Sequence, residues 1–250
     1  MPLSFPRHSA SEINLFVEGG PAAVILKHSG VKDPMNANMA AGIASEDGVR
    51  EGLLNHDMPI ERCVNLAVAK FNRLMALKAA NVDGVEKKRK QVPDMVTNAL
   101  EALRPYGTPQ FPNSGQHKID LTLEGVQAPF VGYLDFYYPE HGLIVDLKTT
   151  TRMPSAVSPS HARQGAIYGT AMGNHEVRFA YATPKECRIY RQEDIRERIE
   201  EVKTIAQTME RFFSQYETWM EAARFVVPNY TSFYMSSPTM RAAGKQLWGF

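Results

Sequence analysis

Cysteine, long apolar runs and excess charge are all scarce in this sequence. The two cysteines, Cys63 and Cys187, are too few for a disulfide framework or a four-cysteine metal site, so we expect two buried thiols. No stretch approaches the roughly 18 apolar residues that a membrane helix needs, and the first residues lack the charged head and apolar stretch of a secretory signal. The sequence therefore predicts a cytoplasmic protein with no membrane partner.

Charge is nearly balanced, because 28 lysines and arginines face 27 aspartates and glutamates. Any nucleic-acid surface must then be a local patch. No repeat or low-complexity tract occurs, and 250 residues at roughly 100 to 200 per domain fit one domain, residues 1–250. The P-loop phosphate motif, the Gly-x-Ser-x-Gly elbow and the His-Glu-x-x-His zinc motif are also absent. These absences argue against a helicase, a serine acyl-transfer enzyme and a zinc hydrolase.

Residues 1–110 have mostly helical patterns. The Ser-Ala-Ser-Glu at residues 9–12 has the spacing of a capping box and predicts the start of a helix. The Gly-Gly-Pro at residues 19–21 should interrupt this helix before it resumes over residues 22–27. Apolar residues then recur at helical spacing in three further segments, residues 40–54, 60–79 and 93–103.

Residues 111–192 predict a sheet with one inserted helix. Short segments rich in β-formers predict a three-stranded meander, residues 119–123, 130–138 and 143–148. A helix over residues 161–172 and two more strands, 177–182 and 187–190, follow. In residues 193–250, apolar spacing predicts a long amphipathic helix over 195–220, and the last twenty residues show no period. The fold class is α/β, a mixed β-sheet flanked by helices, with a helical N-terminal part and a long C-terminal helix.

The strand predicted over residues 143–148 carries charges among apolar residues. Alternation along a strand places Asp146 and Lys148 on one side and the apolar residues on the other. If the preceding turn forms a hairpin, Asp135 lies near the same strand, and two carboxylates converge beside one lysine. Such oxygen ligands suit magnesium, and a lysine can hold an attacking water or neutralise charge on a phosphate. The alternative for Asp146 and Lys148 is a structural ion pair.

The helix that follows carries Gln164 and Tyr168, four residues apart and therefore on one face. An amide and a hydroxyl suit the binding of a phosphate or a base edge, whereas on their own they fit a pair on a helix surface. His161 and Arg163, beside Gln164, are candidates for contacting phosphate. For His161 the alternative is a surface residue at the start of the helix.

Three motifs occur in order along the chain: Gly132-x-x-Asp135, Asp146-x-Lys148 and Gln164-x-x-x-Tyr168. In this order and spacing they resemble the PD-(D/E)XK nuclease superfamily, most closely its RecB-type and phage exonuclease branch. The Ser-Ala-Ser-Glu-Ile at residues 9–13 and the Gly-Gly-Pro are similar to the opening helix of that branch, and the resemblance extends from about residue 9 to 190. It implies a restriction-endonuclease-like core and a magnesium-dependent deoxyribonuclease, an exonuclease of phage or bacterial DNA recombination or repair.

The resemblance also assigns roles within the site. The family carries an acidic or histidine residue on an early helix, and Glu46 stands where that motif is expected, with Glu51 as the substitute. Lys148 would position or help deprotonate the attacking water. The implied ligands of Mg²⁺, or of Mn²⁺, are Glu46, Asp135, Asp146 and the Leu147 main-chain carbonyl. The implied substrate contacts are Gln164 and Tyr168, beside the candidates His161 and Arg163.

The sequence departs from some members of the family. The cysteines that hold an iron–sulfur cluster in those members are missing at both ends, so we expect no cluster. Without helicase motifs it would act as a stand-alone nuclease on DNA, in the host cytoplasm if it comes from a phage. Phage relatives suggest a homo-oligomeric ring and a single-strand annealing protein as partners. The alternatives are a structure-specific or single-strand endonuclease on the same core, a catalytically inactive DNA-binding recombination module, and a structural protein.

Overall fold

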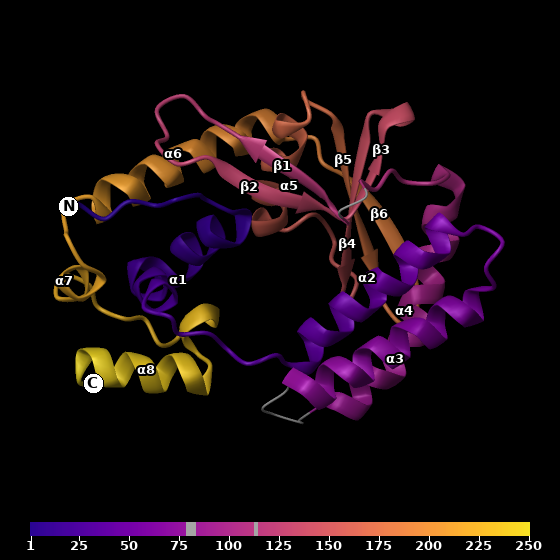
Figure 1. Ribbon diagram of the computed structural model, residues 1–250, viewed down its shortest axis with the longest axis horizontal. Coiled ribbons are helices and arrows are strands. Elements are labelled where there is room, and N and C mark those ends of the chain that lie inside the picture. The colour runs from indigo at the N-terminus through magenta and orange to yellow at the C-terminus, as the bar shows by residue number, and fades with distance from the viewer. Residues whose placement is uncertain (79–83, 113–114) are drawn as a thin grey trace.

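Helices surround mixed β-sheets in the computed structural model, which describes residues 1–78, 84–112 and 115–250 (Figure 1). Four helices come first: α1 (Ala10–His28), α2 (Ala37–Leu54), α3 (Ile60–Lys78) and α4 (Val85–Leu103). The strands and one helix follow: β1 (His117–Leu121), β2 (Phe130–Leu134), β3 (Phe136–Tyr138), β4 (Leu143–Thr149), α5 (Pro159–Ala171), β5 (Glu176–Ala182) and β6 (Cys187–Arg191). The chain ends with α6 (Ile195–Phe213), α7 (Trp219–Ala223), the 3-10 turn η3 (Phe233–Met235) and α8 (Pro238–Trp248).

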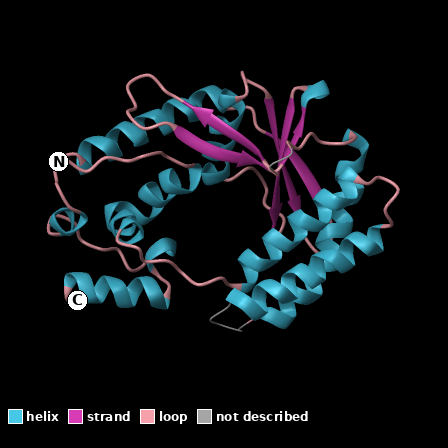
Figure 2. Cartoon of the chain, in the orientation of Figure 1, coloured by secondary structure: helices cyan, strands magenta, loops and turns pink. Residues whose placement is uncertain are grey.

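Four strands form the central sheet in the order β3-β4-β5-β6, and β1 pairs with β2 in a separate antiparallel ribbon (Figure 2). β4 and β5 are parallel because the chain crosses between them through α5, whereas the other pairs are antiparallel. The α/β class with a mixed sheet flanked by helices is therefore confirmed.

The central strand β4 separates two apolar clusters by the alternation of its side chains. Val145 and Leu147 pack among residues of α2, α3 and α4, whereas Ile144 packs among residues of α5 and α6. Asp146 and Lys148 alternate along the strand with Val145 and Leu147, so they lie on the α5 side of the sheet together with Ile144. A third cluster joins α1 to α7, α8 and the end of α6, which gather on the side of the molecule away from α2, α3 and α4 (Figure 1).

The first helix begins as expected, but its capping is one-sided. The Ser9 hydroxyl accepts a hydrogen bond from the Glu12 amide, and Gly20, with φ of 73°, breaks the helical path before Pro21. The Glu12 carboxylate does not complete the capping box by accepting a hydrogen bond from the Ser9 amide. It accepts hydrogen bonds from Lys27 Nζ and His28 Nε2 instead, each at 2.8 Å, so it ties the two halves of α1 together.

Several boundaries differ from the sequence expectations. The predicted helix 93–103 belongs to α4, which already begins at Val85, and Ala79 at the end of the predicted helix 60–79 lies outside the described residues. The three-stranded meander is wrong, because the segment 130–138 breaks between β2 and β3 and joins two different sheets. The long helix ends at Phe213, and the tail contains α8, which no pattern indicated.

Two expectations about composition can be checked against burial. Cys63 is fully buried, as predicted, whereas Cys187 is only partly buried. Burial raises the pKa of the Cys187 thiol to about 12. No helix in the described part of the chain is both long and apolar enough to cross a membrane.

Candidate active site

The break between β2 and β3 places Asp135 against the middle of β4. Its Oδ2 accepts a hydrogen bond from the Leu147 amide at 2.9 Å. The side chain thus takes the place of the main-chain carbonyl that a neighbouring strand would otherwise offer to this amide. Phe136 pairs with Val145 directly after the break. The hairpin thus brings Asp135 next to the strand that carries Asp146, as the sequence predicted.

Asp146 is a buried carboxylate, with 1% of its surface exposed, beside the half-buried ammonium of Lys148. Its Oδ2 lies 2.6 Å from Lys148 Nζ, so the two charged groups form a close ion pair. Burial alone would lower the pKa of Lys148. The charges of Asp146 and Asp135 outweigh burial and hold that pKa above its usual value, so the amine stays protonated at neutral pH.

Gln164 on α5 joins the charged pair to Tyr168. Its Oε1 accepts a hydrogen bond from Lys148 Nζ, and its Nε2 donates to Asp146 Oδ1 and to the Tyr168 hydroxyl, each at 3.0 Å. Burial, followed by the charge of Asp146, raises the pKa of Tyr168 to about 12. The helical spacing of Gln164 and Tyr168 therefore does place both side chains on the face toward β4.

A glycine allows Tyr168 to reach this position. At Gly132 on β2, a Cβ atom would lie 2.5 Å from Tyr168 Cε1, closer than real carbon contacts. The glycine of the Gly132-x-x-Asp135 motif thus makes room for the ring of the Gln164-x-x-x-Tyr168 motif. Two motifs recognised separately in the sequence meet at this contact.

Glu46 on α2 is connected to the site through the side chain of Gln116. Its Oε1 accepts hydrogen bonds from Arg50 Nη2 at 2.6 Å and from Gln116 Nε2 at 2.7 Å, and Gln116 also reaches Asp135 Oδ1 at 3.4 Å. Glu51, the alternative to Glu46, lines a different cavity over α2 and α3. The structure thus places Glu46, and not Glu51, on the side of the aspartates, with Gln116 between it and Asp135.

Negative charge is in excess at this point. Burial raises the pKa of Asp135 well above its usual value, and the charges of Asp146 and Glu46 raise it further. Burial also raises the pKa of Glu46, and Asp47 and Asp146 add to the rise. Among the residues that the structure describes, no three His, Cys, Asp or Glu side chains are close enough together to hold one metal ion as they stand. Glu46 remains one amide away from Asp135, because Gln116 lies between them.

A cavity of about 540 Å³ opens beside this group. It is lined by Lys148, by residues of α5 that include Gln164 and Tyr168, and by residues at the start of α1, in β2 and in η3. Its volume falls within the range of small-molecule and cofactor pockets. Lys148 is therefore accessible to a ligand through this cavity, and Asp146 lies directly behind it.

His161 lines the same cavity, one helical turn before Gln164. Its Nδ1 lies 2.7 Å from the hydroxyl of the buried Tyr181 on β5. Burial, helped by the charge of Lys148, lowers the pKa of His161 to about 4. The imidazole is thus neutral at physiological pH and held in place.

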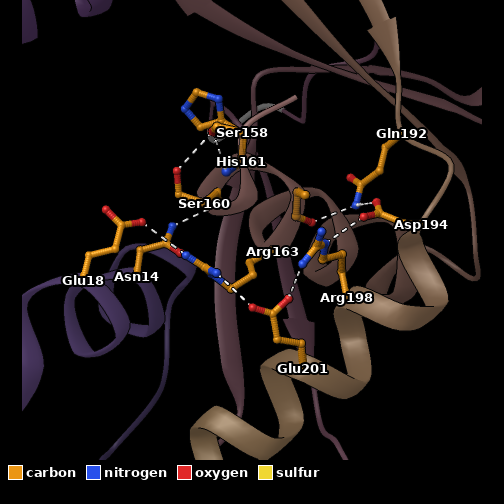
Figure 3. A network of polar contacts seen from close by, with 11 residues as sticks. Asn14, Glu18, Ser158, Ser160, His161, Arg163, Gln192, Asp194, Arg198 and Glu201 are labelled. Atoms are coloured by element: carbon orange, nitrogen blue, oxygen red, sulfur yellow. Dashed lines mark hydrogen bonds and ion pairs between the residues drawn. The ribbon is translucent and has the colours of Figure 1, made fainter. Parts of the chain in front are cut away.

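Arg163 points away from the site, toward α1 and α6 (Figure 3). Its guanidinium, 3% exposed as a residue, donates from Nε to Asn14 Oδ1 at 2.7 Å, from Nη1 to Glu201 at 2.9 Å and from Nη2 to Glu18 at 3.2 Å. The structure therefore does not bring Arg163 to the other predicted site residues. It gives this side chain a structural position, because every nitrogen of the guanidinium already has a partner.

Gln116 is the site residue that the sequence did not indicate. It lies just before β1, in a segment with no motif and no apolar period, and its neutral amide suggests no chemistry. Its role emerges only when the break at Asp135 brings β1 and α2 to the same corner of the fold.

No family model matches this sequence, and no curated protein matches it. Among solved structures, the crystal structure of SSO0001 is similar with a TM-score of 0.36 and 9% sequence identity, over 88% of this chain and 95% of that chain. So distant a similarity supports no assignment of function.

Proposed function

We propose that this protein is a metal-dependent DNA exonuclease built on a restriction-endonuclease-like core. The observation that carries the proposal is the contact group in which Gln164 binds Asp146, Lys148 and Tyr168 at once, with Asp135 held beside them by the Leu147 amide. A structural ion pair would need only the two charged members. Here a cavity borders the group, and its carboxylates repel one another, as expected of a site that binds a cation.

The carboxylates fit a hard divalent cation such as Mg²⁺ or Mn²⁺. The Asp146 carboxylate is buried, and among the described residues only the Lys148 ammonium lies against its Oδ2, so a cation could share this oxygen. Asp135 and Asp146 would hold the ion, and Glu46 would join them by exchanging its present side-chain contacts; the Leu147 carbonyl is the fourth predicted ligand. When bound, the ion would polarise the phosphate and make water more acidic.

Lys148 contributes charge and orientation. Because its pKa is raised, the ammonium donates hydrogen bonds to the attacking water or to a phosphate oxygen and does not itself take up a proton. Gln164 fixes Lys148 Nζ through its Oε1, and the Tyr168 hydroxyl stays protonated as a further hydrogen-bond donor. In the hydrolysis, the water oxygen would bond to phosphorus as the bond from phosphorus to the ester oxygen breaks. The water would release its proton to solvent, the departing ester oxygen would take one up from solvent, and the site would stabilise the charge that builds on the phosphate.

The proposal is tested by digestion of a linear duplex labelled separately at each 5′ and 3′ end, beside a covalently closed circle, with magnesium and with chelator. We expect the linear DNA alone to be degraded, only with metal, and the labels to report the polarity. Lys148→Met should abolish cleavage. The matched control is Lys118→Met, which removes a half-exposed lysine paired with Asp120 on β1 and should leave cleavage unchanged.

Each other outcome has a definite meaning. Cutting of the closed circle would replace the exonuclease by the endonuclease alternative on the same core. Binding of DNA without cleavage under any metal condition would support the inactive recombination module. Equal cleavage by wild type and Lys148→Met, with contaminating nuclease excluded, would overturn the assignment of the site.

A further inference from the structure

His161 is held by more contacts than a surface residue needs. Its Nδ1 bonds the Tyr181 hydroxyl at 2.7 Å, and its ring stacks on Phe179 with centroids 5.8 Å apart and planes at 20°. The Ser158 hydroxyl caps the start of α5 by accepting a hydrogen bond from the His161 amide. Figure 3 shows the ring at one end of the network that runs from His161 through the serines at the start of α5 and Asn14 to Arg163. These contacts hold the ring in one orientation, and His161 lines the cavity.

The proton arrangement follows from the surroundings of Tyr181. Burial raises the pKa of this tyrosine, so the hydroxyl remains protonated, although the main chain and the side chain of Ser158 both act to lower that pKa, as donors toward the tyrosine oxygen do. The hydroxyl proton is then free to point at His161 Nδ1. A neutral imidazole carries one hydrogen, and if Nδ1 accepts from Tyr181, that hydrogen resides on Nε2.

We infer that Tyr181 is a positioning residue that fixes His161 as the Nε2–H tautomer, and that His161 donates this hydrogen bond to a phosphate oxygen of DNA bound in the cavity. The inference rests on the proposed function for the identity of the ligand. The charged groups near His161 are Lys148 and Asp146. A neutral donor suits this place, because an imidazolium beside the Lys148 ammonium would be repelled.

The tautomer can be measured without any cleavage. We would record long-range ¹H–¹⁵N spectra of the full-length protein with ¹⁵N-labelled histidine, and assign the His161 signals from their loss in His161→Gln. We expect hydrogen on Nε2, and a changed Nδ1 shift in Tyr181→Phe. Tyr190→Phe is the control, since Tyr190 bonds the Pro154 carbonyl and lies next to Tyr181. Hydrogen on Nδ1 in the wild type, or identical spectra for Tyr181→Phe and wild type, would overturn the inference.

Kinetics test whether the donor acts on the substrate. With a linear duplex and magnesium, we expect His161→Ala to lower kcat about 20-fold and Tyr181→Phe about fivefold, the sizes of one hydrogen bond to a charged group and of one neutral hydrogen bond. His161→Gln should recover part of the loss, because its amide nitrogen can take the place of Nε2. In the His161→Ala background, Tyr181→Phe should cause no further loss.

An equal loss from Tyr181→Phe with and without His161 would mean that Tyr181 acts independently, which contradicts the inference. If wild-type protein shows the expected tautomer but cleaves no DNA, the proposed function has failed while the positioning by Tyr181 stands. The two failures are thus distinguishable.

Discussion

The two polar faces of α5 show how a structural network differs from a candidate active site. On the face toward α1 and α6, the single guanidinium of Arg163 meets one amide and two carboxylates, and Arg198 and Arg163 lower the pKa of Glu201. On the face toward β4, Gln164 binds Asp146, and the pKa of the neighbouring Asp135 is raised by burial and by the charge of Asp146. The first face is electrostatically satisfied. The second stores a repulsion that a bound cation would relieve.

The substitution Asp135→Asn should have opposite effects on cleavage and on stability, and it is the prediction with the largest expected effect. The amide oxygen can still accept the hydrogen bond of the Leu147 amide, but the charge needed to bind a metal is gone. We expect cleavage to fall about a thousandfold, while the free energy of unfolding in chelator rises by about 1 kcal/mol because a repulsion is removed. Cleavage assays and urea unfolding measure the two effects.

The control for that variant is Asp120→Asn, which changes a half-exposed aspartate on β1 paired with Lys118. It should leave cleavage unchanged and should change the free energy of unfolding by no more than about 0.5 kcal/mol. A loss of stability in Asp135→Asn larger than about 2 kcal/mol would show that this carboxylate is structural, and the contrast between the two faces would disappear.

Arg163→Met is expected to lower stability while leaving cleavage nearly unchanged. Removing the buried guanidinium leaves Asn14, Glu18 and Glu201 without their shared partner, so the free energy of unfolding should fall by about 3 kcal/mol. Cleavage by the folded fraction at low temperature should stay within about twofold of wild type, because this residue does not reach the cavity. A large loss of kcat in a folded Arg163→Met protein would show that Arg163 contributes to the active site after all. Arg198→Met, a more exposed partner of Glu201, should cost no more than about 1 kcal/mol.

The sequence predicts those contacts on the two faces of α5 that follow from the regular spacing of residues along one strand or one helix. Strand alternation places Asp146 and Lys148 together, and helical spacing places Gln164 with Tyr168; the structure has both pairs within bonding distance. The orientation of Arg163 could not be predicted in this way. It depends on the tertiary packing of α5, whose other face is covered by α1 and α6, and no local pattern contains that information.

The fold shows the same limit. The break at Asp135 was not predictable, since residues 130–138 read as one run of β-formers and only the change of sheet partner divides them. Helix α8 was also missed. It has good start signals, with Ser237 capping and Pro238 in the first turn, but its buried residues are only Met240 and Gly244, too few to make an apolar period.

A smaller effect is expected from Gly132→Ala. The added methyl group would lie 2.5 Å from Tyr168 Cε1, so the ring must shift, and Gln164 loses the hydroxyl that its amide contacts. We expect a fall in kcat of about tenfold and a loss of about 1 to 2 kcal/mol in stability. Gly42→Ala on α2 is the control, because its methyl group would make only an ordinary contact, 3.6 Å from Thr149 Oγ1. Unchanged cleavage by Gly132→Ala would show that Tyr168 need not be held where it is.

The smallest effect concerns the dependence of stability on pH in the presence of chelator. Since the pKa of Asp135 is raised in the folded state, its contribution to stability is fully present below its ordinary value of 3.8 and is lost as the pH rises through the folded pKa. Wild type at pH 7 thus carries a penalty that Asp135→Asn lacks, and the gap of about 1 kcal/mol should close as the pH falls toward 4.

The pKa of Glu201 is lowered, so its stabilising contribution is present above its ordinary value of 4.5 and is lost as the pH falls. The deficit of Arg163→Met should therefore also shrink in acid. Plotted against pH, the two variants should approach wild type from opposite sides, Asp135→Asn from above and Arg163→Met from below. Parallel curves for wild type and Asp135→Asn would mean that no repulsion is stored at Asp135, and the electrostatic difference between the two faces of α5 would have to be abandoned.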